Sequence, residues 1–208
     1  VENLPIGLFG DFYSHELTFS LINNNDYKNL NTVFKKCNLK IKKILLKSFV
    51  EGSYIINSNK GHDTFFQIKI DKKNSQLFYF ENEALKFEQN FNFGSDIVIN
   101  DISQVTSLKI DTVKKILDNI NFSQDITKDE LIEKDLFHGE NYIKIKKKLL
   151  FDVAKTRIEE ILEVMIIKNI NVLSFNKKKK EIFFKVNDKL HLKFFENIYK
   201  SFLLKKTT

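Results

Sequence analysis

The sequence predicts a mixed α/β fold, and three features indicate it. Short runs rich in Phe, Ile and Leu follow one another between residues 64 and 93, as strands of a meander do. Apolar residues at helical spacing fill most of 95–168, and two strand patterns and a helix pattern follow near the C-terminus. Strands, then helices, then strands and a helix are typical of a sheet layered with helices.

Composition supports a packed globular protein. The 208 residues include 21 Phe but only 6 Gly and 1 Pro, so bulky side chains can fill a core and few residues interrupt it. One cysteine, Cys37, excludes a disulfide framework and a cysteine zinc site. No apolar run reaches the roughly 18 residues that span a bilayer, and the first residues do not resemble a signal peptide. We therefore expect a reducing, cytosolic setting.

The net charge of +7 has two explanations. The 34 basic residues are spread along the chain and nearly all are lysine, with Arg157 as the only arginine. Lys, Asn, Ile and Phe are abundant together, which codon bias in an AT-rich genome would produce. A polyanion partner is the other explanation, so a basic nucleic-acid-binding protein stays open as an alternative function.

The first 57 residues predict two strands and two helices. The strands are expected at Tyr13–Ile22 and Leu39–Leu46, and a short helix that includes Phe49 and Ser53 follows the second. Asn25 or Asp26 would cap the first helix. This helix would bury one stripe, made of Tyr27, Leu30, Val33, Phe34 and Cys37.

A polar stretch at 57–63 is the best boundary candidate, and a three-stranded meander follows it. The expected strands are Thr64–Asp71, Gln76–Phe80 and Ala84–Phe93. Their short links at 72–75 and 81–83 predict hairpins.

Three helices and further strands complete the pattern. Ser95 or Asp96 caps the first expected helix, Asp111 caps the second, and the third runs from about 141 to 168. Strands are then expected at Asn171–Phe175 and Glu181–Val186, and a last helix at about Leu190–Leu204, which we expect to pack in the core rather than on a membrane.

Four segments occur in a characteristic order: the turn Pro5-Ile6-Gly7-Leu8-Phe9-Gly10, the strand with His15, the helix with Asn29-Leu30, and Gly52-Ser53-Tyr54. In this order they resemble FtsA, the actin-like cell-division protein of bacteria. Glu83-Ala84-Leu85, Gly94-Ser95 with Asn100-Asp101-Ile102, and the long helix through Asp152 and Arg157 continue the similarity.

The resemblance implies an actin-like (ribonuclease H-like) ATPase half preceded by part of an SHS2-type α/β inserted subdomain. Residues 1–57 would be the latter part of that subdomain. Residues 58–208 would be the second actin-like half, with a far helical subdomain at about 110–168. The first actin-like half would be missing, so we expect a fragment or a reduced relative.

The nucleotide loops that the resemblance implies are altered. The family's phosphate loop, Asp-Ile-Gly-Gly-Gly-Thr, matches 69–75, where no glycine remains. Asp71 meets the family aspartate, which would hold Mg²⁺ through water, only after a two-residue shift; unshifted, the position is Lys69. The adenosine motif, Leu-Thr-Gly-Gly, matches 185–188. The degenerate nucleotide-binding residues would be Asp71, Lys72, Lys73, Asn74, Ser75, Gly94, Ser95, Asn187 and Asp188.

Because glycine lets a backbone approach phosphate closely, these losses predict weak or absent ATP hydrolysis. An active ATPase of the same family, with ATP and Mg²⁺ as cofactors, is the first alternative. For Lys72 and Lys73 a plain lysine-rich hairpin turn is the simpler interpretation.

The implied function is that of a division adaptor. It would bind the acidic C-terminal tail of FtsZ, self-associate as actin-like proteins do, and link the division ring to the inner face of the cell membrane. The membrane anchor itself would lie in a tail absent from this chain. Residue matching gives Lys147, Asp152 and Arg157 as the partner-binding positions, although a solvated helix face explains them equally well.

The other reactive residues predict no chemistry. The four histidines lie far apart, without metal-binding spacing. Cys37 on an apolar stripe is expected in a core. Asp96 and Asp101 could form an acid/base pair, but capping and solvated positions are commoner for such residues. We expect no catalytic residue, no metal site and no nucleic-acid partner.

Overall fold

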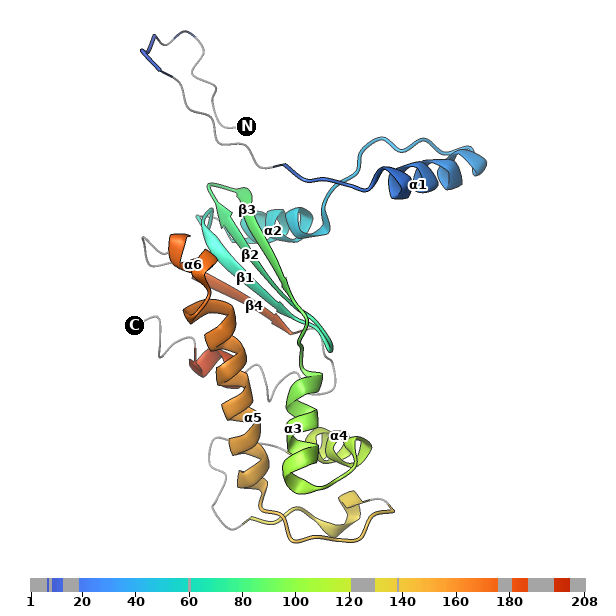
Figure 1. Ribbon diagram of the computed structural model, residues 1–208, viewed down its shortest axis with the longest axis vertical. Helices are drawn as coiled ribbons and strands as arrows, with labels where there is room; N and C mark the ends of the chain where they lie inside the picture. The colour runs from blue at the N-terminus through green and yellow to red at the C-terminus, as the bar shows by residue number, and fades with distance from the viewer. Residues whose placement is uncertain are drawn as a thin grey trace. The chain divides into compact units, whose positions relative to one another are not determined.

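The computed structural model describes residues 7, 9–12, 19–59, 61–120, 130–137, 139–175, 181–186 and 197–202. The chain divides into two units, Val1–Val50 and Glu51–Thr208. Most of the described helices and all the described strands belong to the second unit (Figure 1). The mixed α/β class is therefore confirmed, while the domain limit predicted at 57/58 stays a prediction.

A four-stranded sheet forms the centre of the second unit. Strands β1 (Phe65–Ile70), β2 (Ser75–Glu81) and β3 (Ala84–Phe91) form the predicted antiparallel meander. Strand β4 (Glu181–Val186) pairs parallel to β1, so the strand order is β3-β2-β1-β4. Every residue of β1 is buried, because both faces of this inner strand are covered.

The two faces of the sheet differ in size. Phe66, Ile68 and Ile70 point from β1 into the larger core, where helices α3 and α5 supply most of the partners. Phe65 lies on the other face with Phe78 and Phe80, against Ile55 and Ile56 of helix α2 (Lys47–Ser58). A β-carbon at Gly52 would lie 1.9 Å from the Phe80 ring, so this glycine permits the close contact of helix and sheet.

The helices of the larger core follow the sheet in chain order. They are α3 (Asp96–Thr106), α4 (Ile110–Asn119), the short 3₁₀-helix η1 (Lys134–Phe137), α5 (Lys147–Leu162), the π-turn η2 (Glu163–Ile167) and α6 (Ile170–Phe175). Ser95 is the N-cap residue of α3, as predicted, although its side chain makes no cap hydrogen bond.

Two predicted helix starts are wrong. Lys109, not Asp111, is the N-cap residue of α4, and the Glu140 carboxylate accepts a hydrogen bond from the Lys109 N–H at 3.1 Å. The long helix begins at Lys147 and not near 141, because residue Ile145 accepts a backbone hydrogen bond from Ile132 at 2.9 Å instead. The capping group and the pairing partner both come from distant parts of the chain.

The predicted strand at Asn171–Phe175 is also wrong, since these residues belong to α6. Asn169 starts this helix: its side-chain oxygen accepts from the Asn171 N–H at 3.1 Å. The Asn169 amide nitrogen donates to Gln89 of β3 at 2.9 Å, which holds the capping residue in place.

The last predicted helix is described at 197–202, where the chain is helical. Ile198, Tyr199 and Phe202 are buried in the larger core. The predicted packing of this helix in the core is therefore confirmed for its described part.

In the first unit, the second predicted strand and the buried stripe are not found. Helix α1 (Asn24–Lys36) forms, but Asn23 caps it and none of its residues is buried. Cys37 is exposed, so its predicted place in a core is wrong. Leu39–Leu46 forms no strand, because no described segment pairs with it, and neither do 19–22. The rest of the expected first strand, 13–18, lies outside the described residues.

Candidate functional site

The carboxyl ends of β1 and β4 lie at the same edge of the sheet, where ligands commonly bind in open α/β sheets. The two strands are parallel, with Ile70 opposite Val186. Asp71 therefore follows β1 at this edge, and the chain leaves β4 there too. Asn187 and Asp188, predicted to face a nucleotide, lie outside the described residues.

The turn between β1 and β2 is tight and closed by its own backbone. The Asp71 N–H donates to the Asn74 carbonyl at 2.9 Å. Ser75 is buried, and its hydroxyl donates to the Phe93 carbonyl at 2.7 Å. Lys72 and Lys73 are exposed at the tip of the turn.

The start of helix α3 lies directly against this turn. The Ser95 N–H donates to the Asp71 carbonyl at 3.0 Å, and the Asp96 N–H donates to the Lys72 carbonyl at 2.9 Å. A β-carbon at Gly94 would lie 2.1 Å from the Asp71 oxygen, so only glycine fits this approach. Amide groups at a helix start are the usual anion binders, and here two of them hold the turn instead.

The structure thus brings together the described members of the predicted nucleotide set. Asp71, Lys72, Lys73, Asn74, Ser75, Gly94 and Ser95 occupy one turn and the helix start beside it. The turn is closed by its own backbone hydrogen bond, and the carbonyl oxygens of Asp71 and Lys72 accept hydrogen bonds from the start of α3.

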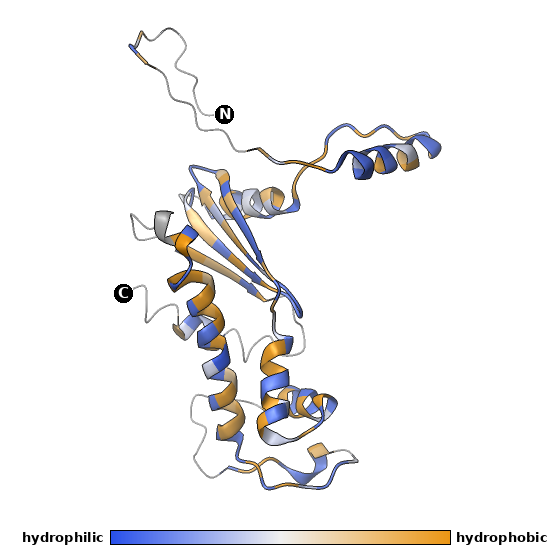
Figure 2. Cartoon of the chain, in the orientation of Figure 1, coloured by the Kyte–Doolittle hydropathy of each residue, from blue (hydrophilic) through white to orange (hydrophobic). Residues whose placement is uncertain are grey.

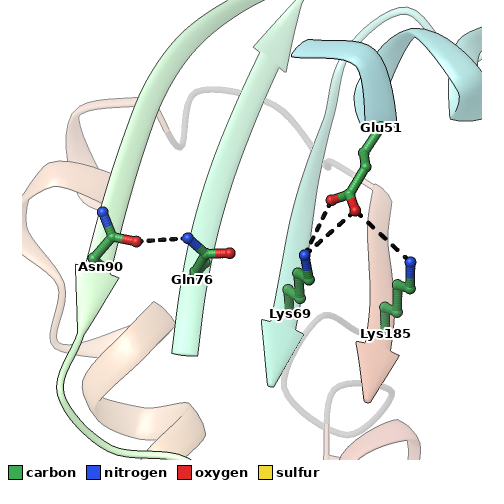
Figure 3. A network of polar contacts seen from close by, with 5 residues as sticks. All are labelled: Glu51, Lys69, Gln76, Asn90 and Lys185. Carbon is green, nitrogen blue, oxygen red and sulfur yellow. Dashed lines mark hydrogen bonds and ion pairs between the residues drawn. The ribbon is translucent and has the colours of Figure 1, made fainter. Parts of the chain in front are cut away.

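A second polar cluster lies on the α2 face of the sheet, and the sequence interpretation missed it (Figure 3). The Lys69 side chain is only 5% exposed, and its ammonium group lies 3.3 Å and 3.4 Å from the two carboxylate oxygens of Glu51 in α2. Lys185 of β4 approaches the same carboxylate at 3.9 Å. The available signal was the lysine within a strand of mostly apolar residues, since a buried lysine needs a partner.

Lys69 also concerns the Mg²⁺ ion that the resemblance implies at this edge of the sheet. It occupies the position where the unshifted family alignment has the Mg²⁺-holding aspartate, and it carries a positive charge there. Among the described residues, no three His, Cys, Asp or Glu side chains gather to hold a metal ion. Lys69 itself, a cation paired with Glu51, does not fit the role of a Mg²⁺-holding residue.

The predicted partner-binding residues lie on α5, and two of them have partners within the chain. Lys147 contacts Glu130 at 2.6 Å, and Arg157 bonds to Asp101 of α3 and to Glu160. The hydrogen bond to Asp101 raises the pKa of Arg157 above its ordinary value. Asp152 is exposed.

Asp96 and Asp101, for which an acid/base pair was the less favoured interpretation, have separate partners in the structure. Asp101 pairs with Arg157, and the Asp96 N–H holds the β1–β2 turn. His62 pairs with Glu181 at the start of β4, while His15, His138 and His191 lie outside the described residues.

The comparisons with known proteins found similarity to solved structures only. No family model and no curated protein matches the sequence. Among solved structures, the ethanolamine utilization protein EutJ from Carboxydothermus hydrogenoformans is 11% identical, with a TM-score of 0.48 over 76% of this chain and 47% of that one. MreB5 of Spiroplasma citri bound to AMPPNP is 10% identical, with a TM-score of 0.48 over 89% and 67%.

An archaeal actin homologue, Ta0583, is 7% identical, with a TM-score of 0.46 over 76% of this chain and 46% of that one. The chain thus spans about half the length of EutJ and Ta0583.

Proposed function

We propose that this chain is an actin-like, FtsA-type division adaptor that works by recognition and not by ATP hydrolysis. The observation that carries the proposal is the closed β1–β2 turn. Two amide groups of α3 bond to its carbonyl oxygens, and Gly94 brings the helix start against it. A phosphate would have to displace these bonds and would meet carbonyl oxygens in place of glycine N–H groups.

Calorimetric titration with ATP and Mg²⁺ tests this proposal. We expect binding no tighter than about 1 mM, because Lys72 and Lys73 attract a triphosphate only as solvated charges. Such residual binding should disappear in Lys72→Ala/Lys73→Ala and at high salt. Micromolar binding with turnover would instead establish the active-ATPase alternative.

The partner surface belongs to the N-terminal part of α5. Four lysines lie within 144–148, and the first turn of the helix holds no acidic residue. A helix start favours an anion, and these cations add to its field. Lys147 is engaged with Glu130, and no carboxylate of the described residues pairs with Lys144 or Lys148. We propose that an acidic peptide, the C-terminal tail of FtsZ, binds here.

Fluorescence anisotropy with a labelled peptide of that tail measures this interaction. Lys144→Glu/Lys148→Glu should weaken binding at least about tenfold, since it reverses two charges at the surface, and binding should weaken as salt is added. Lys115→Glu in α4 is a control at an exposed lysine of another helix. Equal affinity in all three proteins would exclude α5 as the peptide surface, whatever the outcome with ATP.

A further inference from the structure

Helix α1 carries an apolar stripe that nothing in the described chain covers. Tyr27, Leu30, Val33 and Phe34 recur at helical spacing and are 41%, 40%, 59% and 38% exposed. The opposite side of the helix holds Lys28, Thr32 and Lys35. Most residues of the helix are hydrophilic, and hydrophobic residues lie among them (Figure 2). Its sequence is therefore amphipathic, and its apolar side faces solvent.

The segment after α1 continues this exposure. Residues 39–46 form no strand, and Ile44, Leu45 and Leu46 are 43%, 50% and 42% exposed in direct succession. Three consecutive exposed apolar residues are unusual on a soluble surface. The stripe and this run both lie within residues 24–47.

The same region is strongly basic. It contains seven lysines and one acidic residue, Asp26. The lysines are Lys28, Lys35, Lys36, Lys40, Lys42, Lys43 and Lys47. An occupant of the apolar surface must therefore also supply negative charge.

We propose that residues 24–47 form a lipid-binding segment for an anionic bilayer surface. Helix α1 would lie in the interfacial plane with its stripe among the acyl chains and its lysines at the headgroups. A folded partner would need one surface shaped for the stripe of α1 and another for the non-helical run at 44–46. A bilayer interface has no fixed shape and can accommodate both. Juxtamembrane lysines gain further from anionic lipid. The proposal goes beyond the adaptor function above, because it assigns membrane contact to residues within this chain.

Co-sedimentation of the full chain with vesicles tests the segment. One vesicle type is phosphatidylcholine alone, and the other contains about one third phosphatidylserine. We expect binding to the second type, little binding to the first, and release at high salt. Equal binding to both types, or to neither, would overturn the proposal.

Matched variants distinguish the contribution of the apolar stripe to vesicle binding from the contribution of charge. Phe34→Asp and Thr32→Asp each add one negative charge to α1, but only the first places it on the stripe. We expect Phe34→Asp to weaken vesicle binding at least about tenfold and Thr32→Asp to stay within about threefold of the wild type. Lys35→Glu should weaken binding severalfold more than Lys115→Glu, which makes the same change in the second unit.

Sedimentation velocity distinguishes the other occupants. A dimer that Phe34→Asp dissociates, together with no vesicle binding, would assign the stripe to a second copy of the chain and overturn the lipid proposal. The acidic-peptide assay on α5 is independent of these variants, so lipid binding and peptide binding can fail separately.

Discussion

Lys69 shows how one residue can change the chemistry of a strand end. Its ammonium group is buried on the α2 face, and the Glu51 carboxylate compensates its charge. A buried ion pair offsets the cost of desolvation only partly, so a lysine here adds little stability over an apolar residue. What it does change is the chemistry of this strand position, because a lysine paired with Glu51 stands where the family alignment, without a shift, has a Mg²⁺-holding aspartate.

Gly94 is the residue whose replacement tests the turn most directly. In Gly94→Ala the new methyl group would meet the Asp71 carbonyl, a backbone atom that cannot rotate away. We expect a loss of about 1–3 kcal/mol in the free energy of unfolding, measured by urea denaturation. The usual gain from Gly→Ala, about 0.4–1 kcal/mol, is smaller than this loss.

Gly10→Ala is the matched control for this substitution. A β-carbon at Gly10 would meet one backbone oxygen at 3.6 Å, an ordinary contact, so its effect should stay within about 0.5 kcal/mol. An unchanged urea midpoint in Gly94→Ala would mean that α3 does not hold the β1–β2 turn.

At the scale of elements, patterns that local sequence controls were predicted correctly. Strand β1 is wholly buried and β2 mostly buried, as their apolar runs predict. The links between β1, β2 and β3 have two to four residues, which is short enough only for antiparallel hairpins. Helix α3 follows from Gly94-Ser95-Asp96 and the spacing of Ile99 and Ile102, both buried. Each of these elements contains its own turn or cap signal.

The elements that were predicted wrongly depend on distant partners. Leu39–Leu46 has strand-like residues, but a strand exists only when another segment pairs with it. Residues 171–175 became helical because Gln89, 80 positions away from Asn169, fixes the residue that caps α6. The ion pair of Glu51 with Lys69 likewise joins α2 to β1, and no spacing within either element reveals it.

At the scale of the whole molecule, burial is concentrated in the second unit. Strands β1 and β2 lie in a core shared with α3, α4 and α5, whereas α1 buries no residue. A helix of 13 residues that buries none of its side chains gains little from packing and is marginal in water. The lipid contact proposed above would add to the stability of α1, whereas β1 and β2 are held by the core of the second unit.

Hydrogen exchange of the full chain measures this difference. We expect α1 amides to show opening free energies of about 0–1 kcal/mol, while amides of β1 and β2 exchange only through global unfolding, at about 5 kcal/mol or more. Equal protection of α1 and β1 in free protein would contradict the assignment of α1 as an unpartnered helix. Addition of phosphatidylserine vesicles should raise protection in α1 and leave β1 unchanged, because the proposed lipid contact orders the first unit without altering the core of the second.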